Sequence, residues 1–119
     1  MSDTSLSIDV NSMKRVSTVT AAGRIDSSNA TELDGALKQV MNDGKYNIVV
    51  NLSGVNYMSS AGLRALVSAL RECKKHRGDV RLSAPSERVA EVLDLAGLTV
   101  ADAPLFQVYS DDTAAVGSF

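Results

Sequence analysis

The chain has 119 residues, of which 45% are hydrophobic and 22% are charged, and its net charge at pH 7 is −2. These values are typical of one globular domain with a single hydrophobic core, and they exclude wholesale disorder. The slight negative charge and the 4% aromatic content provide neither the basic field nor the stacking side chains of a nucleic-acid-binding surface. We therefore expect one domain over residues 1–119 and no nucleic-acid partner.

Residues that hold metals or form disulfides are scarce. Cys73 and His76 are the single cysteine and the single histidine, so an internal disulfide is impossible and a zinc site is excluded. The apolar runs are too short to cross a bilayer, and Met1–Ser5 lacks the order of a secretory signal. We expect a cytoplasmic protein with no metal, no cofactor and no membrane partner.

The first third of the chain predicts a hairpin followed by a helix. Alternating and β-branched residues predict strands over residues 6–10 and 14–21, and residues 22–28 form a turn-rich connection. Asn29 and Glu32 have the spacing of a capping box, which would begin the helix. Its apolar stripe consists of Ala30, Leu33, Leu37, Val40 and Met41.

The centre of the chain predicts a buried strand, a loop and a second helix. Ile48–Leu52 is a nearly unbroken apolar run, which is typical of a strand covered on both faces. Residues 53–59 are predicted to form a loop. The helix that follows ends with Lys74–Arg77, whose charges suit its C-terminal dipole and indicate a solvated helix end, and Gly78 terminates it.

The last third predicts a strand over residues 79–83, a helix from Pro85–Ser86 to Gly97, a short strand over residues 106–109 and a helix from about Ser110. Strands that alternate with helices imply parallel crossovers. We therefore predict an α/β fold with a mixed sheet of four to five strands and about four helices. Functional loops in such sheets lie beyond the carboxyl ends of the strands, where the predicted loop over residues 53–59 stands.

Two adjacent serines, Ser59 and Ser60, stand where the second helix is predicted to begin. A helix N-terminus has unpaired N–H groups and a partial positive charge, so it can accept an anion. From the residues alone, an ordinary helix cap is the simplest role for a serine there. The other role is a site at which added phosphate switches a surface. The residues leave both interpretations open.

The segment Val50–Leu63 (VNLSGVNYMSSAGL) resembles the signature of the STAS-domain anti-sigma-factor antagonists. That signature is an apolar strand, Asp-Leu-Ser, a short loop and Asp-Ser-Ser/Ala-Gly-Leu. Gly23–Asp26 and Leu93–Leu98 are similar to two further motifs of the family. The resemblance covers about residues 6–116 and implies a single STAS domain with its core in that range.

The resemblance implies that Ser60 is the phosphoryl acceptor, with Ser59 as the second choice. Two residues depart from the family pattern, because Ser59 stands where many members have Asp and Asn51 replaces the Asp of Asp-Leu-Ser. The resemblance also places a partner-binding surface around the serines. This surface comprises Asp26, Tyr57, Met58, Ser59, Ser60, Ala61, Gly62 and Arg64.

We expect a specific role for three of these residues. Gly62 lacks a Cβ and would allow close approach of a partner backbone. Arg64 stands one helical turn beyond Ser60 and would reach a phosphate there. Met58, like the tyrosine before it, would provide an apolar anchor under or beside the interface.

The implied partners are an anti-sigma factor with serine kinase activity, which binds the unphosphorylated domain, and a metal-dependent serine phosphatase that resets it. The alternative is a non-catalytic STAS scaffold module in a stress-signalling or transport complex. An enzyme is disfavoured, because the chain has no GxxxxGK[ST] loop and no catalytic Ser-His-Asp arrangement. His76 stands about 24 Å along the helix from Ser60, at 1.5 Å per residue. We therefore assign no catalytic residue.

Overall fold

The strands form one sheet whose spatial order follows the chain, β1-β2-β3-β4-β5, in a computed structural model that describes residues 6–99, 102 and 104–119. β1 and β2 are antiparallel, and the remaining neighbours are parallel. This arrangement confirms the predicted mixed sheet with an antiparallel strand at one side. The strands are β1 (Ser7–Ser12), β2 (Ser17–Ile25), β3 (Asn47–Met58), β4 (Asp79–Ser83) and β5 (Val108–Tyr109).

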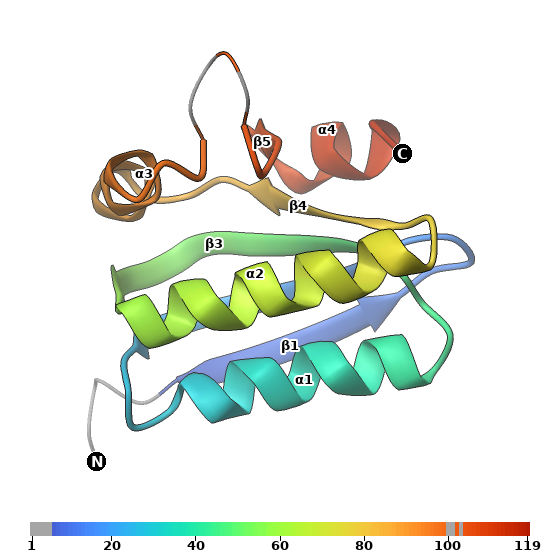
Figure 1. The fold of residues 1–119 in the computed structure, drawn as a ribbon, viewed down its shortest axis with the longest axis horizontal. Coiled ribbons are helices and arrows are strands. Elements are labelled where there is room, and N and C mark those ends of the chain that lie inside the picture. The colour runs from blue at the N-terminus through green and yellow to red at the C-terminus, as the bar shows by residue number, and fades with distance from the viewer. Residues whose placement is uncertain (1–5, 100–101, 103) are drawn as a thin grey trace.

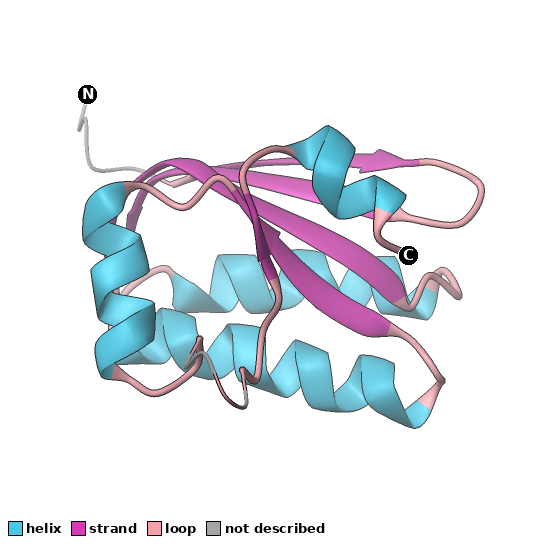
Figure 2. Cartoon of the chain, turned by 90° about the horizontal axis from the view of Figure 1, so that it is seen from above, coloured by secondary structure: helices cyan, strands magenta, loops and turns pink. Residues whose placement is uncertain are grey.

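Helices cover both faces of this sheet. α1 and α2 lie side by side across one face (Figure 1), and α4 packs on the opposite face (Figure 2). The apolar stripe predicted for the first helix is buried in the core of α1. The helices are α1 (Ala30–Asn42), α2 (Ser60–Lys75), α3 (Glu87–Leu95) and α4 (Asp112–Gly117).

Consecutive residues of β3 enter different cores because successive side chains of a strand point to opposite faces. Ile48 and Val50 belong to the main core beneath α1 and α2, whereas Val49 packs with Ala115 of α4 on the other face. All of these side chains are buried. The unbroken apolar run therefore has the predicted cause, a central strand covered on both faces.

The predicted loop over residues 53–59 is wrong for most of its length, because β3 continues to Met58. The turn-rich connection predicted over residues 22–28 is likewise wrong over residues 22–25, because β2 continues to Ile25. The two strands pair from Ala22 with Gly54 to Ile25 with Met58. One register irregularity, between Thr20 and Ala22, precedes this stretch, and a second, between Gly23 and Arg24, interrupts it. Gly54 is required there, since a Cβ on it would lie 2.8 Å from the Cβ of Ala22. The two strands therefore pair through close backbone packing at Gly54. The polar composition of the segment does not indicate a strand.

The predicted capping box at the start of α1 is also wrong. Asn29 occupies the N-cap position but makes no side-chain cap hydrogen bond. Instead, its Oδ1 accepts from the backbone N–H of Asp26 at 2.9 Å, and its Nδ2 donates to the carbonyl of Arg24 at 2.9 Å. The side chain is buried and fixes the path of the chain from β2 into α1.

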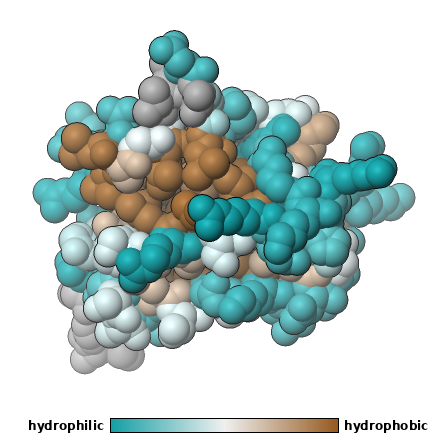
Figure 3. All heavy atoms as spheres, in the orientation of Figure 1, coloured by the Kyte–Doolittle hydropathy of each residue, from teal (hydrophilic) through white to brown (hydrophobic). Residues whose placement is uncertain are grey.

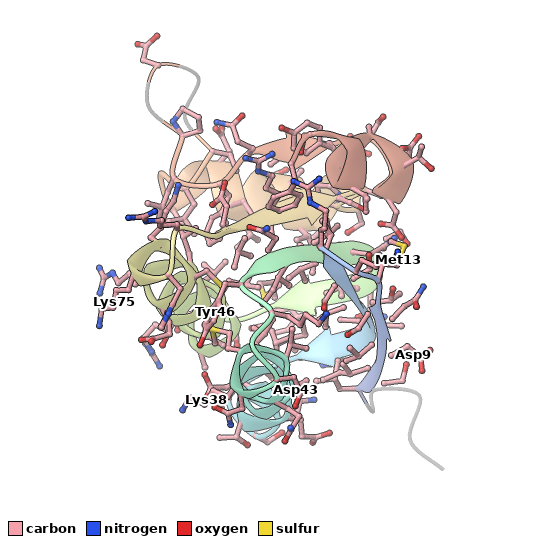
Figure 4. All side chains as sticks on the ribbon, turned by 90° about the vertical axis from the view of Figure 1, so that its right-hand side faces the viewer. Asp9, Met13, Lys38, Asp43, Tyr46 and Lys75 are labelled. Carbon is pink, nitrogen blue, oxygen red and sulfur yellow. The ribbon has the colours of Figure 1, made fainter. Side chains whose placement is uncertain are left out.

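The far end of α2 is a solvated basic surface, as predicted. Lys74–Arg77 are exposed, and Lys75 extends outward in the end-on view of Figure 4. His76 stacks on Tyr46 with 3.9 Å between ring centroids, and its Nε2 lies 3.3 Å from a carboxylate oxygen of Glu72. These contacts give His76 a structural role at the helix end.

The last strand is shorter than predicted, because β5 contains only Val108 and Tyr109 and Phe106 lies in the main core. The predicted terminal helix is present as α4, with Asp111 as its N-cap. The Oδ1 of Asp111 accepts from the backbone N–H of Ala114 at 2.8 Å.

Candidate functional site

Ser59 is the N-cap of α2. Its Oγ accepts a hydrogen bond from the backbone N–H of Gly62 at 3.2 Å, and its carbonyl accepts from that of Leu63 at 3.1 Å. Its own N–H donates to the carbonyl of Ile25 in β2 at 2.8 Å. The cap therefore fixes the start of α2 against the end of the neighbouring strand. The interpretation of Ser59 as a helix cap is confirmed.

Ser60 is the first residue of α2 and is exposed. The hydroxyl of Ser59 makes the cap hydrogen bond with Gly62. The Oγ of Ser60, in contrast, has no hydrogen-bond partner among residues 6–99, 102 and 104–119. The N–H groups of a first helical turn have no partner within the helix and carry partial positive charge. A phosphate on Ser60 would therefore stand in solvent at the positive end of α2, outside the core.

Asp26 lies next to this helix start because Ile25, its neighbour in the chain, is bonded to Ser59. Its Oδ1 accepts from the hydroxyl of Ser28 at 2.5 Å and from the backbone N–H of Ser28 at 2.9 Å. The Nε of Arg24 lies 3.8 Å from its other oxygen. The hydrogen bond from the Ser28 hydroxyl is the main reason that the pKa of Asp26 is lowered, and Arg24 contributes less. Asp26 is thus a carboxylate held in a fixed loop beside Ser59.

Tyr57 presents an aromatic surface on the same edge. Its side chain is 37% exposed, and the guanidinium of Arg24 lies over its ring at 4.2 Å from the centroid. The two residues are register partners on β2 and β3, so the sheet itself brings them together. Arg24 therefore links the aromatic ring to the carboxylate of Asp26. This contact orders three side chains on one surface.

Gly62 and Met58 support this surface from beneath. Both are buried, and a Cβ on Gly62 would lie 2.5 Å from the Sδ of Met58 and 2.7 Å from the Cγ2 of Ile25. The expectation that Gly62 admits a partner backbone is therefore wrong, because the space beside it is filled by the protein's own core. The glycine allows α2 to pack closely on the ends of β2 and β3. Met58 is buried beneath this surface, and its role under a partner interface stays a prediction.

Ala61 and Arg64 complete the predicted set. Ala61 is half-buried and packs against the core, whereas Arg64 is exposed one turn along α2 from Ser60. The structure therefore brings together Asp26, Tyr57, Ser60 and Arg64 as side chains with accessible surface near the start of α2.

Asn51 does not belong to this surface. Its Nδ2 donates to the Oδ1 of Asp112 at 2.9 Å, and its own Oδ1 accepts from the backbone N–H and hydroxyl of Ser53 at 2.9 and 2.8 Å. The hydroxyl of Ser83, which is fully buried, donates to the same oxygen of Asp112. An amide is needed at residue 51, since a carboxylate could not donate to Asp112. This departure from the family pattern thus serves the docking of α4.

Sequence reasoning missed two features of the site. Arg24 was not selected as a site residue, although it stands in the Gly23–Asp26 motif, two positions before Asp26, which was selected. The apolar residues Leu63 and Val67 were not selected either, yet both line a groove that begins at Ser60. The groove also needs Ala96 and Leu98, which follow α3, and the sequence does not give their position relative to α2.

In the part of the chain that the structure describes, no helix is long and apolar enough to span a membrane. Over the same residues, no group of three or more His, Cys, Asp or Glu side chains is placed to hold a metal ion.

Comparison with known proteins identifies similar chains. The family model described as the STAS domain matches residues 7–111. The anti-sigma-B factor antagonist of Staphylococcus aureus is 28% identical over 93 residues, which cover 78% of this chain and 86% of that protein.

Solved structures share the fold. An anti-sigma factor antagonist from Mycobacterium paratuberculosis superposes with a TM-score of 0.85 at 26% identity, covering 98% of this chain and 96% of that one. The phosphorylated form of SpoIIAA, a Bacillus cell fate determinant, has a TM-score of 0.73 at 17% identity and covers 94% of this chain and 98% of its own. At that identity the second likeness concerns the fold alone.

Proposed function

Because the chain belongs to the STAS domain family, we propose that it is an anti-sigma-factor antagonist that works as a phosphorylation-controlled binding switch. The unphosphorylated domain binds an anti-sigma factor, and phosphorylation of Ser60 releases it. Similarity to proteins named anti-sigma factor antagonists supports the class of partner. The choice of Ser60 rests on the geometry of the site.

The main support for this proposal is that Ser60 is exposed at the first position of α2. The hydroxyl of its neighbour Ser59 already accepts the cap hydrogen bond. Phosphorylation adds about −1.5 to −2 charges and three acceptor oxygens. The free domain tolerates this group, since the N–H groups and dipole of the helix offset part of the charge. A protein docked over Ser60 must instead desolvate a dianion.

That difference sets the expected size of the switch. Burying a phosphate dianion at an interface costs at least a few kcal/mol, because a single guanidinium offsets only part of its charge, and this corresponds to a loss of about 100-fold in affinity. In this proposal, the exposed Tyr57 and Arg64 and the half-buried Asp26 share one interface with Ser60. The buried Met58 and Gly62 hold that interface in place and contribute little surface of their own.

The proposed cycle needs two enzymes that act on this chain in the cytoplasm. The anti-sigma factor has serine kinase activity and phosphorylates Ser60, and a metal-dependent serine phosphatase removes the phosphate. The chain itself serves as binding partner and substrate, with no catalytic activity of its own. Ser59 is a poorer acceptor because transfer to its hydroxyl would disrupt the cap bond to Gly62.

The test uses each anti-sigma factor kinase encoded in the source genome, purified and titrated against the chain by isothermal calorimetry. We expect one of them to bind wild type and Ser60→Ala, and to bind Ser60→Glu about 100-fold more weakly. Thr113→Glu is the matched control, because Thr113 is an exposed hydroxyl residue in the first turn of α4, on the other face of the sheet. With ATP, the complex with Ser60→Ala should persist while the wild-type complex dissociates.

Equal binding by wild type and Ser60→Glu would contradict the switch. Such a result, together with a constitutive high-mass assembly and no phosphorylation, would favour a non-catalytic scaffold module instead.

A further inference from the structure

An apolar groove begins at Ser60 and follows the outer face of α2. Figure 3 shows hydrophobic residues gathered over the region between α2 and α3, with hydrophilic side chains along the edge formed by α2. The apolar lining comes from α2 and from the segment that follows α3. It consists of Leu63, Val67, Ala96 and Leu98. Leu95, the last residue of α3, is 79% exposed.

The polar residues of this groove are predominantly basic. Arg64, Arg71 and Lys75 line it from α2, and Glu72 is the single acidic side chain among its lining residues. Glu72 is already paired, with Lys75 at 3.7 Å and with His76 at 3.3 Å. Within the described residues, neither Arg64 nor Arg71 has a carboxylate within ion-pair distance. The groove therefore combines an apolar floor with two guanidinium groups that are free to bind carboxylates.

The dimensions of the groove suit a helix. From Leu63 to Lys75 the lining residues of α2 span about 18 Å at 1.5 Å per residue, which is the length of about three helical turns. Leu63, Val67, Arg71 and Lys75 recur at intervals of four, so they form one row along α2. Such a row forms a ridge inclined to the helix axis, and ridges of this kind are surfaces against which another helix packs.

We propose that this groove binds an amphipathic helix of the anti-sigma factor, whose apolar stripe lies on Leu63, Val67 and Leu98 and whose flanking carboxylates pair with Arg64 and Arg71. This inference rests on the proposed function and names the element of the partner that the site recognises. The positive groove selects an acidic helix, since opposite charges attract across an interface and like charges exclude a partner.

The charge of the groove would also explain why phosphorylation releases the anti-sigma factor. Ser60 lines one end of the same groove, next to Arg64. A phosphate on Ser60 would pair with Arg64 in place of the partner's carboxylate and would repel the remaining carboxylates. Phosphorylation would thus change the charge of the groove at the end where the helix enters, without any change in the fold.

The first experiment reverses one charge. Arg71→Glu should weaken binding of the anti-sigma factor by about tenfold or more, because it places a carboxylate against those of the partner helix. Arg15→Glu makes the same charge change at an exposed position between β1 and β2 and should bind like wild type. Affinity should fall as salt rises, and it should fall less steeply for Arg71→Glu.

The second experiment identifies the occupant. Ser68→Cys places a thiol in the groove at an exposed position, while the native Cys73 is buried and has a pKa raised to about 12 by desolvation. A photo-crosslinker on residue 68 should react with the anti-sigma factor, and the cross-linked peptide should lie in a helix that carries carboxylates beside an apolar stripe. A cross-link to a second copy of this chain would overturn the proposal.

Binding by Ser60→Glu, compared with binding by the groove variants, distinguishes the phosphorylation switch from the groove proposal. If Ser60→Glu loses the anti-sigma factor but Arg71→Glu and Val67→Thr bind it like wild type, the groove proposal fails and the switch stands. If Ser60→Glu binds like wild type, the proposed function itself fails, and the groove proposal fails with it.

Discussion

Ser59 and Ser60 are adjacent hydroxyl residues with different surroundings. The Oγ of Ser59 accepts from the N–H of Gly62, whereas the side chain of Ser60 is exposed. The first side chain stabilises the helix, and the second is available for modification. The two positions should therefore respond to alanine substitution in different ways.

Ser59→Ala should lower the free energy of unfolding by about 1 kcal/mol, because it removes an N-cap hydrogen bond. Ser60→Ala should change it by less than about 0.5 kcal/mol, as is usual for exposed positions. Urea unfolding followed by circular dichroism measures both. Equal losses for the two variants would show that the cap is not confined to Ser59.

Two glycines in helices should respond to alanine with opposite signs. Gly62→Ala places a Cβ within 2.7 Å of Met58 and Ile25, so overpacking outweighs the gain in helix propensity and we expect a net loss of about 1 kcal/mol. Gly35→Ala in α1 meets nothing within 4 Å and should gain about 0.5–1 kcal/mol. Thermal and urea unfolding of both variants test the prediction. A gain for Gly62→Ala would mean that α2 shifts to make room.

Asp26 should make the stability of the domain depend on pH. Its pKa is lowered in the folded state, chiefly by the hydroxyl of Ser28, so its charged form is favoured by folding. The stabilisation is present above the pKa of the unfolded chain and is lost as the pH falls through the folded value. The difference in unfolding free energy between wild type and Asp26→Asn should therefore be larger at pH 7 than at pH 3. A difference that grows in acid would contradict this assignment.

At the scale of elements, α4 is fixed to the sheet by a polar contact as well as by Ala115. The carboxylate of Asp112 accepts from Asn51 on β3 and from Ser83 on β4, so one side chain joins three elements. Asn51 also accepts from Ser53. The amide is suited to both tasks because it has a donor and an acceptor.

Asn51→Asp should therefore loosen α4. The change removes a donor and places two carboxylates in contact, which we expect to cost about 1–3 kcal/mol of stability. Adding Asp112→Asn restores a donor and an acceptor and should recover most of the loss. Unfolding free energies of the two single variants and the double variant form the test, and a double variant less stable than Asn51→Asp alone would contradict the contact.

The elements also show which parts of the fold the sequence could predict. The helices, the buried β3 run and the antiparallel hairpin follow from periodicity and apolar content, because these patterns report burial directly. The extension of β3 to Met58 does not, since Ser53, Gly54 and Asn56 have the composition of a loop. That segment is a strand because its backbone pairs with β2 across the close contact of Gly54 with Ala22.

The site was predictable to a similar degree. The serines were located because a motif places them at a helix start, and the structure gives them distinct surroundings. The sequence could not distinguish Gly62 as a core contact from Gly62 as an opening for a partner, since the neighbours that decide it, Met58 and Ile25, come from two strands. The groove depends on the position of the segment after α3, which no local pattern specifies.

At the scale of the whole molecule, the fold and the switch occupy separate regions. The main core lies between α1, α2 and one face of the sheet, and Ser60 stands outside it at the helix end. A phosphate there changes surface charge and leaves the packing of the core unaltered. The folded structure should therefore be the same in both states, while the set of partners differs.

Site-resolved mass spectrometry of the chain purified from its own cells would show whether Ser60 receives the phosphate. We expect a fraction of molecules to carry phosphate on Ser60 and none to carry it on Ser59. Phosphate on Ser59 in place of Ser60, or a chain that stays unmodified under every growth condition, would contradict this expectation.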